Sequence, residues 1–462
     1  VFLQVNLGMN AYGADTNHDH NFNLVNILGV ADESALSRSK NNVASMFNVE
    51  QYKRVVYGDY QTEADKLPNV EIGKVYTAKG TDGKEYTRTA YMPNSCHAYY
   101  LVTNDAIQTV IYAITSQVGV GLDAGIKSYA DHNRISTVWE IKDLSFIMIL
   151  VGVVGVMFLV ASVLMDTAVF ADLKLQSSSV PGFPKKSWQR TVSLVALSAI
   201  PLLLYKRGIL MSEKFLDFID VSKLWLLGGT NNSYISWQWL VSIAMLAIFL
   251  FYHFSWGRSK GGNLASYGFV TANEKGFHLN YVLKAFLFGL TVVGSGYLVF
   301  SIINAYTQQG IHITTFMLST IKTNRSLAFL MYFLFQIPYF LTSSLAMKSV
   351  GMGEASDDAR GTLKTISISA AISVGALFLA WLVFVCFLLT QHTLTSWSYL
   401  MKDRMYVYMF AILPLVIGMS IANALNIYAY KKTNSIWTGL FTALLWGTWM
   451  LISCGGMAKY FY

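Results

Sequence analysis

Hydrophobic and polar residues follow different patterns in two parts of the chain, and the pattern changes near residue 144. From there on, apolar runs recur that approach or exceed the roughly 20 helical residues needed to cross a bilayer about 30 Å thick. The second run is the weakest, because Pro201 interrupts it and Lys206 and Arg207 end it. The pattern predicts an all-α polytopic domain of about eight transmembrane helices, at 144–169, 191–211, 235–254, 282–306, 326–347, 364–390, 405–428 and 435–456.

Residues 1–125 carry shorter runs of both helical and strand period, which is typical of an α/β domain. A near-continuous apolar run over 24–30 predicts a parallel strand that is covered on both faces. Asp82-Gly83 is a hairpin turn signal between two strand-like runs. Residues 126–143 are interpreted as a linker to the membrane domain, 144–462. The other elements expected in the first domain are strands at 52–57, 70–77 and 85–92 and helices at 35–47 and 101–118.

Composition and charge support this division. Of the 462 residues, 54% are hydrophobic and only 13% are charged, which is typical of a membrane protein. Residues 1–143 carry a net charge of −4 and residues 144–462 a net charge of +12. The overall charge of +8 therefore reflects basic membrane loops, and no basic face with interleaved aromatic residues suggests nucleic-acid binding. The three cysteines show neither a disulfide framework nor a metal-binding spacing.

The loops between the apolar runs predict an orientation. Loops on one side of the membrane hold 13 Lys and Arg residues, and those on the other side hold 9. The richer side is expected to be cytoplasmic. This places residues 1–143 outside the cell membrane, and the lipid bilayer is the expected partner of the helices that follow.

Two acidic residues, Asp32 and Glu33, directly follow the apolar run over 24–30. In α/β sheets, chemistry gathers just beyond the carboxyl ends of parallel strands, which makes these carboxylates site candidates. Acidic residues also begin turns and cap helices, and that alternative stays open here.

Histidines supply the other candidate groups. His97 lies in the loop before the helix expected at 101–118; alone it is typical of a hydrogen-bonded loop residue, but a carboxylate such as Asp32 would orient it as an acid and base. His18 and His20 have a spacing that suits a metal ion, yet no third ligand follows at a sensible spacing. A polar loop is the preferred interpretation of that segment, and we expect neither a metal nor a cofactor.

The order of strand, GVADES, helix, hairpin, SCH loop and closing helix resembles the C-terminal half of an α/β-hydrolase domain. More closely, it is similar to the membrane-attached α/β hydrolases of Gram-positive bacteria, in which such a domain precedes a multi-pass membrane domain. The resemblance covers about residues 1–120 and, more loosely, the membrane region. It implies a membrane-bound serine hydrolase, an esterase or peptidase-like enzyme, with Asp32 as triad acid and His97 as base.

The nucleophile of such an enzyme is missing from this sequence. α/β hydrolases usually carry it on a G-x-S-x-G turn, and the nearest match, Gly418-Met419-Ser420-Ile421-Ala422, lies within an apolar run. Because the nucleophile precedes the acid in this fold, we expect an N-terminally truncated domain that is inactive as it stands.

Two other functions remain open from sequence alone. The chain could be a transporter, or a non-catalytic membrane scaffold with a degenerate hydrolase-like domain. Transporters tend to carry charged groups within their spans, and Asp166, near the end of the first predicted span, is the only acidic candidate. Amide side chains at Asn304, Gln336, Asn423 and Asn426 are expected to bond between helices.

Overall fold

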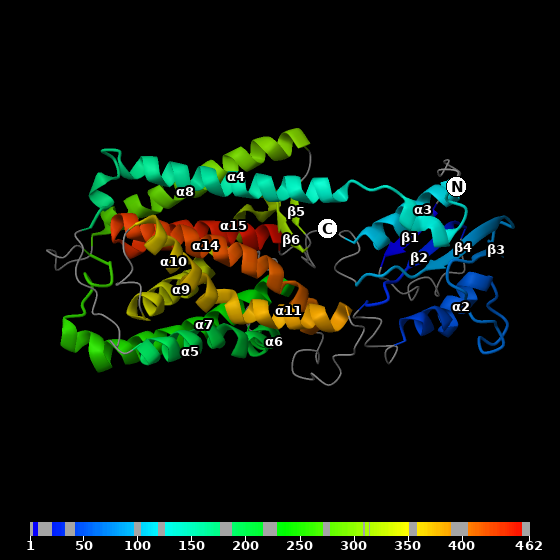
Figure 1. Cartoon of the computed structure of the whole chain (residues 1–462), viewed down its shortest axis with the longest axis horizontal. Helices are drawn as coiled ribbons and strands as arrows, with labels where there is room; N and C mark the ends of the chain where they lie inside the picture. The colour runs from blue at the N-terminus through cyan, green and yellow to red at the C-terminus, as the bar shows by residue number, and fades with distance from the viewer. Residues whose placement is uncertain are drawn as a thin grey trace. The chain divides into compact units, whose positions relative to one another are not determined.

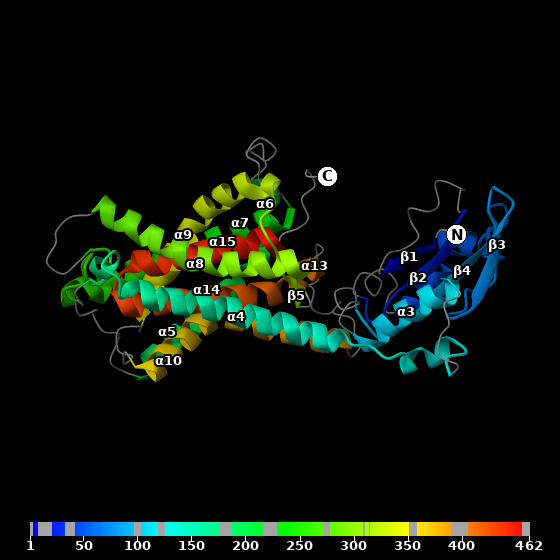
Figure 2. The ribbon, with the colours of Figure 1, turned by 90° about the horizontal axis from the view of Figure 1, so that it is seen from above.

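The computed structural model of the chain describes residues 3–7, 21–32, 42–96, 103–118, 125–175, 187–215, 229–270, 278–307, 310–313, 315–350, 358–389 and 405–454. These residues divide into two compact units, which are considered separately. The first unit comprises 1–144 and 382–410, and the second comprises 145–381 and 411–462. Figures 1 and 2 show the strands near the N-terminus and the long helices that make up most of the chain.

Four short strands of the first unit form a mixed sheet. Its order is β1 (Leu3–Leu7), β2 (Asn23–Ile27), β4 (Glu85–Tyr91) and β3 (Val75–Lys79). The first three run parallel, and β3 pairs antiparallel with β4. The predicted parallel strand after residue 23 and the predicted hairpin are therefore confirmed. The hairpin turn depends on glycine, because Gly83 has a left-handed φ of 76°.

The sheet is covered on both faces, as the apolar run in β2 predicted. Val25 and Ile27 pack with Tyr91 of β4 against the inner face of α3 (Asn104–Val118). Asn26, which points to the opposite face, is buried near the buried Tyr52 of α2 (Glu50–Tyr57). Figure 1 shows these two helices beside the strands.

The strand predicted at 52–57 is wrong, because these residues belong to α2. Tyr52, Val55 and Val56 are all buried, which is the spacing of one helix face and not of a strand. The helix ends at Gly58, whose φ of 62° suits a left-handed C-terminal cap.

Two other predicted segments differ in detail. Of the helix expected at 35–47, the described part is a 3₁₀ helix, η2 (Val43–Asn48), and residues 33–41 lie outside the described residues. Within the expected linker, Tyr129 of η4 (Tyr129–Arg134) packs against the buried cluster of Val25, Ile27 and Tyr91. A long helix also begins in this segment, at Trp139.

Eight helices among the described residues are long and apolar enough to cross a membrane, which indicates a multi-pass membrane protein and confirms the predicted number. The second, sixth and seventh are each built from two α-helices in succession. The helices are α4 (Trp139–Met165), α5 (Ser187–Leu203), α6 (Tyr205–Phe215), α7 (Gly229–Tyr252), α8 (Leu279–Thr307), α9 (Ser326–Val350), α10 (Ala359–Ala370), α11 (Ala376–Leu389), α13 (Met405–Phe410), α14 (Ile412–Thr433) and α15 (Ile436–Cys454).

The second unit is organised around α15. This helix packs against α8, α9 and α14, and it lies between other helices in both views (Figures 1 and 2). Its two tryptophans are buried and donate their indole N–H groups to backbone carbonyls, Trp446 to Gly418 at 2.8 Å and Trp449 to Ser319 at 2.9 Å. Buried indoles are thus satisfied without water.

A neighbouring helix, α7, contacts the second span where it is interrupted near Pro201. α5 ends at Leu203 and α6 begins at Tyr205. The Pro201 carbonyl accepts a hydrogen bond from the Trp237 indole at 2.9 Å. Gly208 lets α6 approach this part of α7, since a Cβ atom there would lie 2.4 Å from the Trp237 Cα.

Replacing Gly208 with Ala is therefore expected to lower the thermal unfolding temperature of the protein in detergent. The backbone of α7 cannot yield as a flexible side chain can, and overpacking of this kind costs about 1–3 kcal/mol. Gly155→Ala is the matched control, because a Cβ at Gly155 meets no atom within 4 Å. Equal unfolding temperatures for the two variants would contradict a close contact at Gly208.

Candidate functional site

The carboxyl ends of β2 and β4 lie next to each other, and their pairing continues into the loops beyond. Past the strands, Leu28 N–H donates to the Tyr91 carbonyl at 3.0 Å and Val30 N–H to the Pro93 carbonyl at 3.0 Å. Ala31 N–H then donates to the Ser95 carbonyl at 3.1 Å. The loop that carries Asp32 and the loop that precedes His97 are thus held together by backbone hydrogen bonds. This is the edge of a parallel sheet where ligand sites occur.

Asp32 is fully buried, at 0% exposure, at this edge. Its backbone N–H donates to the Gly29 carbonyl at 3.0 Å, which closes a turn directly after the strand. A carboxylate removed from water is stable only with hydrogen-bond donors or a counter-charge nearby. The sequence prediction of a carboxylate at the strand end therefore matches its observed position.

The other predicted groups lie elsewhere. His97, Glu33, His18 and His20 are outside the described residues, so the pairing of Asp32 with His97 stays a prediction. The segment 418–422 lies within α14, where a Cβ at Gly418 would meet the Met450 side chain. That segment forms a helix contact, unlike the strand-to-helix turn of a hydrolase nucleophile.

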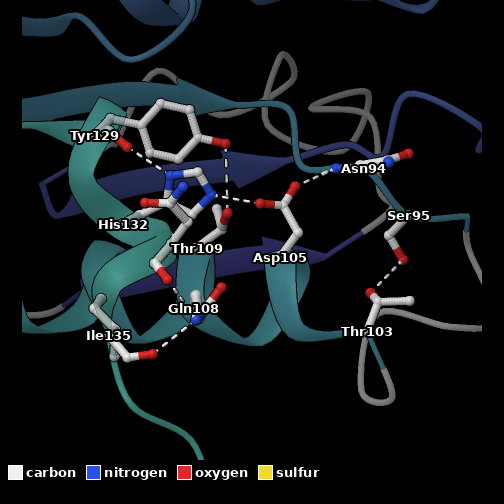
Figure 3. A network of polar contacts seen from close by, with 10 residues as sticks. Asn94, Ser95, Thr103, Asp105, Gln108, Thr109, Tyr129, His132 and Ile135 are labelled. Atoms are coloured by element: carbon white, nitrogen blue, oxygen red, sulfur yellow. Dashed lines mark hydrogen bonds and ion pairs between the residues drawn. The ribbon is translucent and has the colours of Figure 1, made fainter.

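A second acid–histidine pair, not predicted from the sequence, lies on the face of the sheet covered by α3 (Figure 3). The Nε2 atom of His132, in η4, is 2.6 Å from Asp105 Oδ1, in the first turn of α3. His132 Nδ1 is 2.6 Å from the Tyr129 carbonyl oxygen, and the two rings stack with centroids 4.4 Å apart. Both ring nitrogens therefore have partners.

Asp105 also connects this pair to the loop before His97. Its second carboxylate oxygen accepts a hydrogen bond from the Asn94 backbone N–H (Figure 3). On the same loop, the buried Ser95 accepts from Thr103 Oγ1 at 3.0 Å, and its own hydroxyl donates to the Cys96 carbonyl at 3.2 Å. The loop is thus fixed on one side by the Asp32 turn and on the other by α3.

Tyr129 lies beside this pair, and its surroundings disfavour its charged form. Burial, the largest cause, raises the pKa of the Tyr129 phenol. The negative charge of Asp105 raises it further, whereas the hydrogen bond with Thr109 acts in the opposite direction. The phenol is therefore neutral and serves as a packing surface for the imidazole of His132.

Removing the Asp105 carboxylate is expected to destabilise the first unit. Asp105→Ala would leave the mostly buried His132, 13% exposed, and the Asn94 N–H without their acceptor, at a cost of about 1–3 kcal/mol. Thermal unfolding of the full chain and limited proteolysis near residues 93–96 and 129–134 would measure the effect. Glu63→Ala, which removes an exposed ion pair with Lys66, is the control and should cost little. Equal losses of stability in both variants would contradict the inference that Asp105 holds His132 and the loop at Asn94 in place.

Three pairs of polar side chains form hydrogen bonds between membrane helices. Gln336 Oε1 accepts from Thr448 at 3.0 Å, Asn423 Oδ1 from Ser369 at 3.0 Å, and Asn426 donates to Ser344 at 2.8 Å. This confirms the predicted interhelical bonds at Gln336, Asn423 and Asn426. Asp166 lies just beyond the end of α4, is exposed, and is 3.2 Å from Lys174 Nζ.

Within the described residues, no group of three or more His, Cys, Asp and Glu residues could hold a metal ion. In comparisons with known proteins, no family model matches the chain, and neither does a curated protein or a solved structure.

Proposed function

We propose that the sheet unit supplies the acid and the histidine of a serine hydrolase that acts on an ester or amide at a membrane. One observation carries the proposal: the loops that follow two adjacent parallel strands are joined by backbone hydrogen bonds, with the buried Asp32 on one loop and His97 two residues beyond the Ser95 carbonyl on the other. The resemblance to membrane-attached α/β hydrolases supports the same pair of residues.

In this mechanism, the Asp32 carboxylate accepts a hydrogen bond from one imidazole nitrogen of His97 and orients the ring. The other nitrogen takes the proton of a serine hydroxyl as that oxygen attacks the substrate carbonyl, and then gives the proton to the leaving alcohol or amine. Asp32 stays ionised throughout and stabilises the imidazolium that forms. A water molecule then attacks the acyl group. His97 takes a proton from this water and gives a proton to the serine oxygen, which leaves as the hydroxyl.

The membrane helices act, in this proposal, to hold the hydrolase unit at the bilayer. The hydrogen bonds among Gln336, Thr448, Asn423 and Ser369 pair polar side chains across helices, which is a structural use of such groups in lipid. Asp166, the only acidic residue within the predicted spans, lies at a helix end with a lysine partner. These contacts favour an anchor over a transporter.

The test compares His97 with His132 in the full-length protein. His97→Ala should abolish hydrolysis of an activated ester and labelling by a fluorophosphonate probe, because both need an activated serine. His132→Gln should leave the intrinsic rate near that of the wild type when measured on protein that remains folded. Loss of activity only on substitution of His132 would move the base to the Asp105 pair, and a full-length wild type without hydrolysis or labelling would overturn the proposal.

A further inference from the structure

A cavity of about 520 Å³ lies in the second unit where α7 ends. It is bounded by the last turns of α7, the loop that follows and one residue of α9. Most of its walls are apolar or aromatic, and Arg258, His253 and Asn263 add polar groups. The apolar and aromatic lining residues are Phe249, Phe254, Leu264, Tyr267, Phe269 and Leu345.

The backbone around this cavity is held in place by specific contacts. α7 passes into a π-helical turn, His253–Gly257, a feature that is frequent at functional sites. A Cβ at Gly257 would lie 2.8 Å from the Tyr267 hydroxyl, so the chain closes tightly here. The far end of the loop is fixed to the start of α15, since Ile436 N–H donates to the Gly268 carbonyl at 2.9 Å and the Trp437 indole to the Phe269 carbonyl at 3.0 Å. The cavity is therefore preformed.

The cavity offers hydrogen-bond donors that have no acceptor among the described residues. The guanidinium of Arg258 forms no ion pair with any described residue, and Arg258 is exposed. The side-chain oxygen of Asn263 accepts a hydrogen bond from Ser266 N–H at 2.9 Å, so the side-chain NH₂ group of Asn263 remains as a donor. No Asp or Glu is among the lining residues that the structure describes. An anion is thus the charge that fits.

The surface next to the cavity is apolar. Phe251, Phe254 and Leu264 are 68%, 66% and 59% exposed, and Trp256 is 45% exposed. Large exposed apolar side chains with a tryptophan at the end of a membrane-length helix are typical of the boundary between hydrocarbon and headgroups. A ligand of this cavity would therefore meet a cation and an apolar surface together.

We infer that this cavity binds an anionic phospholipid. The phosphate would lie at Arg258 and Asn263, because a guanidinium pairs with phosphate through two parallel hydrogen bonds. The glycerol and the first acyl carbons would lie along Phe254, Leu264 and Leu345. A zwitterionic lipid would bring a second, cationic group for which the described lining holds no carboxylate, so a net negative headgroup is preferred. Basic pockets beside membrane helices bind lipid headgroups in this way.

Native mass spectrometry of the purified full chain in detergent tests the inference, with titration of phosphatidylglycerol, phosphatidylcholine and inorganic phosphate. Phosphatidylglycerol should bind more tightly than phosphatidylcholine, and inorganic phosphate should not compete at matched concentration. Arg258→Ala should weaken phosphatidylglycerol binding by about tenfold, the scale of one charge-assisted hydrogen-bonded pair. Lys260→Ala is the matched control, because Lys260 is exposed in the same turn but does not line the cavity.

A second variant keeps the test decisive if Arg258→Ala unfolds. Arg258→Lys retains the charge but loses the bidentate geometry, so it should weaken phosphatidylglycerol binding less than Arg258→Ala does. Phe254→Ala should also weaken phosphatidylglycerol binding, because Phe254 lines the cavity where the acyl carbons would lie. Equal binding of the two lipids, equal losses for Arg258→Ala and Lys260→Ala, or full competition by inorganic phosphate would each overturn the inference.

Discussion

Replacing Asp32 with Asn in the full-length protein is expected to lower kcat for ester hydrolysis by about 10⁴-fold, if the well-studied Ser-His-Asp triad is a guide. The Asp32 side chain is fully buried at the strand end, where water screens interactions between charged groups only weakly. In the proposed triad, an amide at this position would favour the wrong tautomer of His97 and would not stabilise its protonated form. Steady-state hydrolysis of an activated ester measures the loss, and the thermal unfolding temperature of the variant checks that it folds.

Glu33→Gln is the matched control for this prediction, because it removes the charge of the residue that follows Asp32 in the sequence. Its effect on kcat should be small. His18 and His20 substitutions should also leave the rate near that of the wild type, and chelators should have no effect. Equal and small effects of Asp32→Asn and Glu33→Gln would exclude Asp32 as the triad acid.

Replacing Trp446 with Ala is expected to destabilise the membrane unit by about 3–5 kcal/mol, the usual cost of truncating a buried tryptophan. Trp446 is 0% exposed in α15, and its indole packs against Trp449 with ring centroids 5.5 Å apart. The substitution would open a cavity and also remove the hydrogen bond to the Gly418 carbonyl. The shift of the thermal unfolding temperature in detergent measures the loss.

Trp188→Ala is the control, because Trp188 in α5 is 63% exposed. Trp446→Phe would separate the two contributions, since it keeps an aromatic ring but removes the indole N–H. If Trp446→Ala and Trp188→Ala shift the unfolding temperature equally, the central position of α15 in the bundle is wrong.

Long, strongly patterned segments were predictable from the sequence, and short ones were not. Eight membrane helices follow from apolar runs whose length exceeds anything a soluble core requires. The 52–57 segment was mistaken for a strand, because a run of six residues with adjacent valines does not distinguish a strand from a helix. There the buried face, shared by Tyr52, Val55 and Val56, was decided by packing on the sheet.

The candidate site was predictable only where it depends on strand ends. Asp32 follows a recognisable buried strand, so its place at the sheet edge could be expected. The Asp105–His132 pair could not, because 27 residues separate its members and η4 lies in a segment with no periodic pattern. An acidic residue in the first turn of α3 was a weak signal, as such residues commonly stabilise helix N-termini.

The burial of α15 has a consequence for the order in which the membrane unit is assembled. In the apolar segment of this helix 89% of the residues are buried inside the protein, against 22% for α4. Most of α4 can thus face lipid as soon as it is synthesised. By contrast, α15 is the last of the eight described spans, and it is buried only after it packs among α8, α9 and α14. During translation, the sides of those three helices that contact α15 therefore lack this partner until α15 is synthesised. A chain that lacks the residues from 436 onward would therefore form a bundle without its central helix.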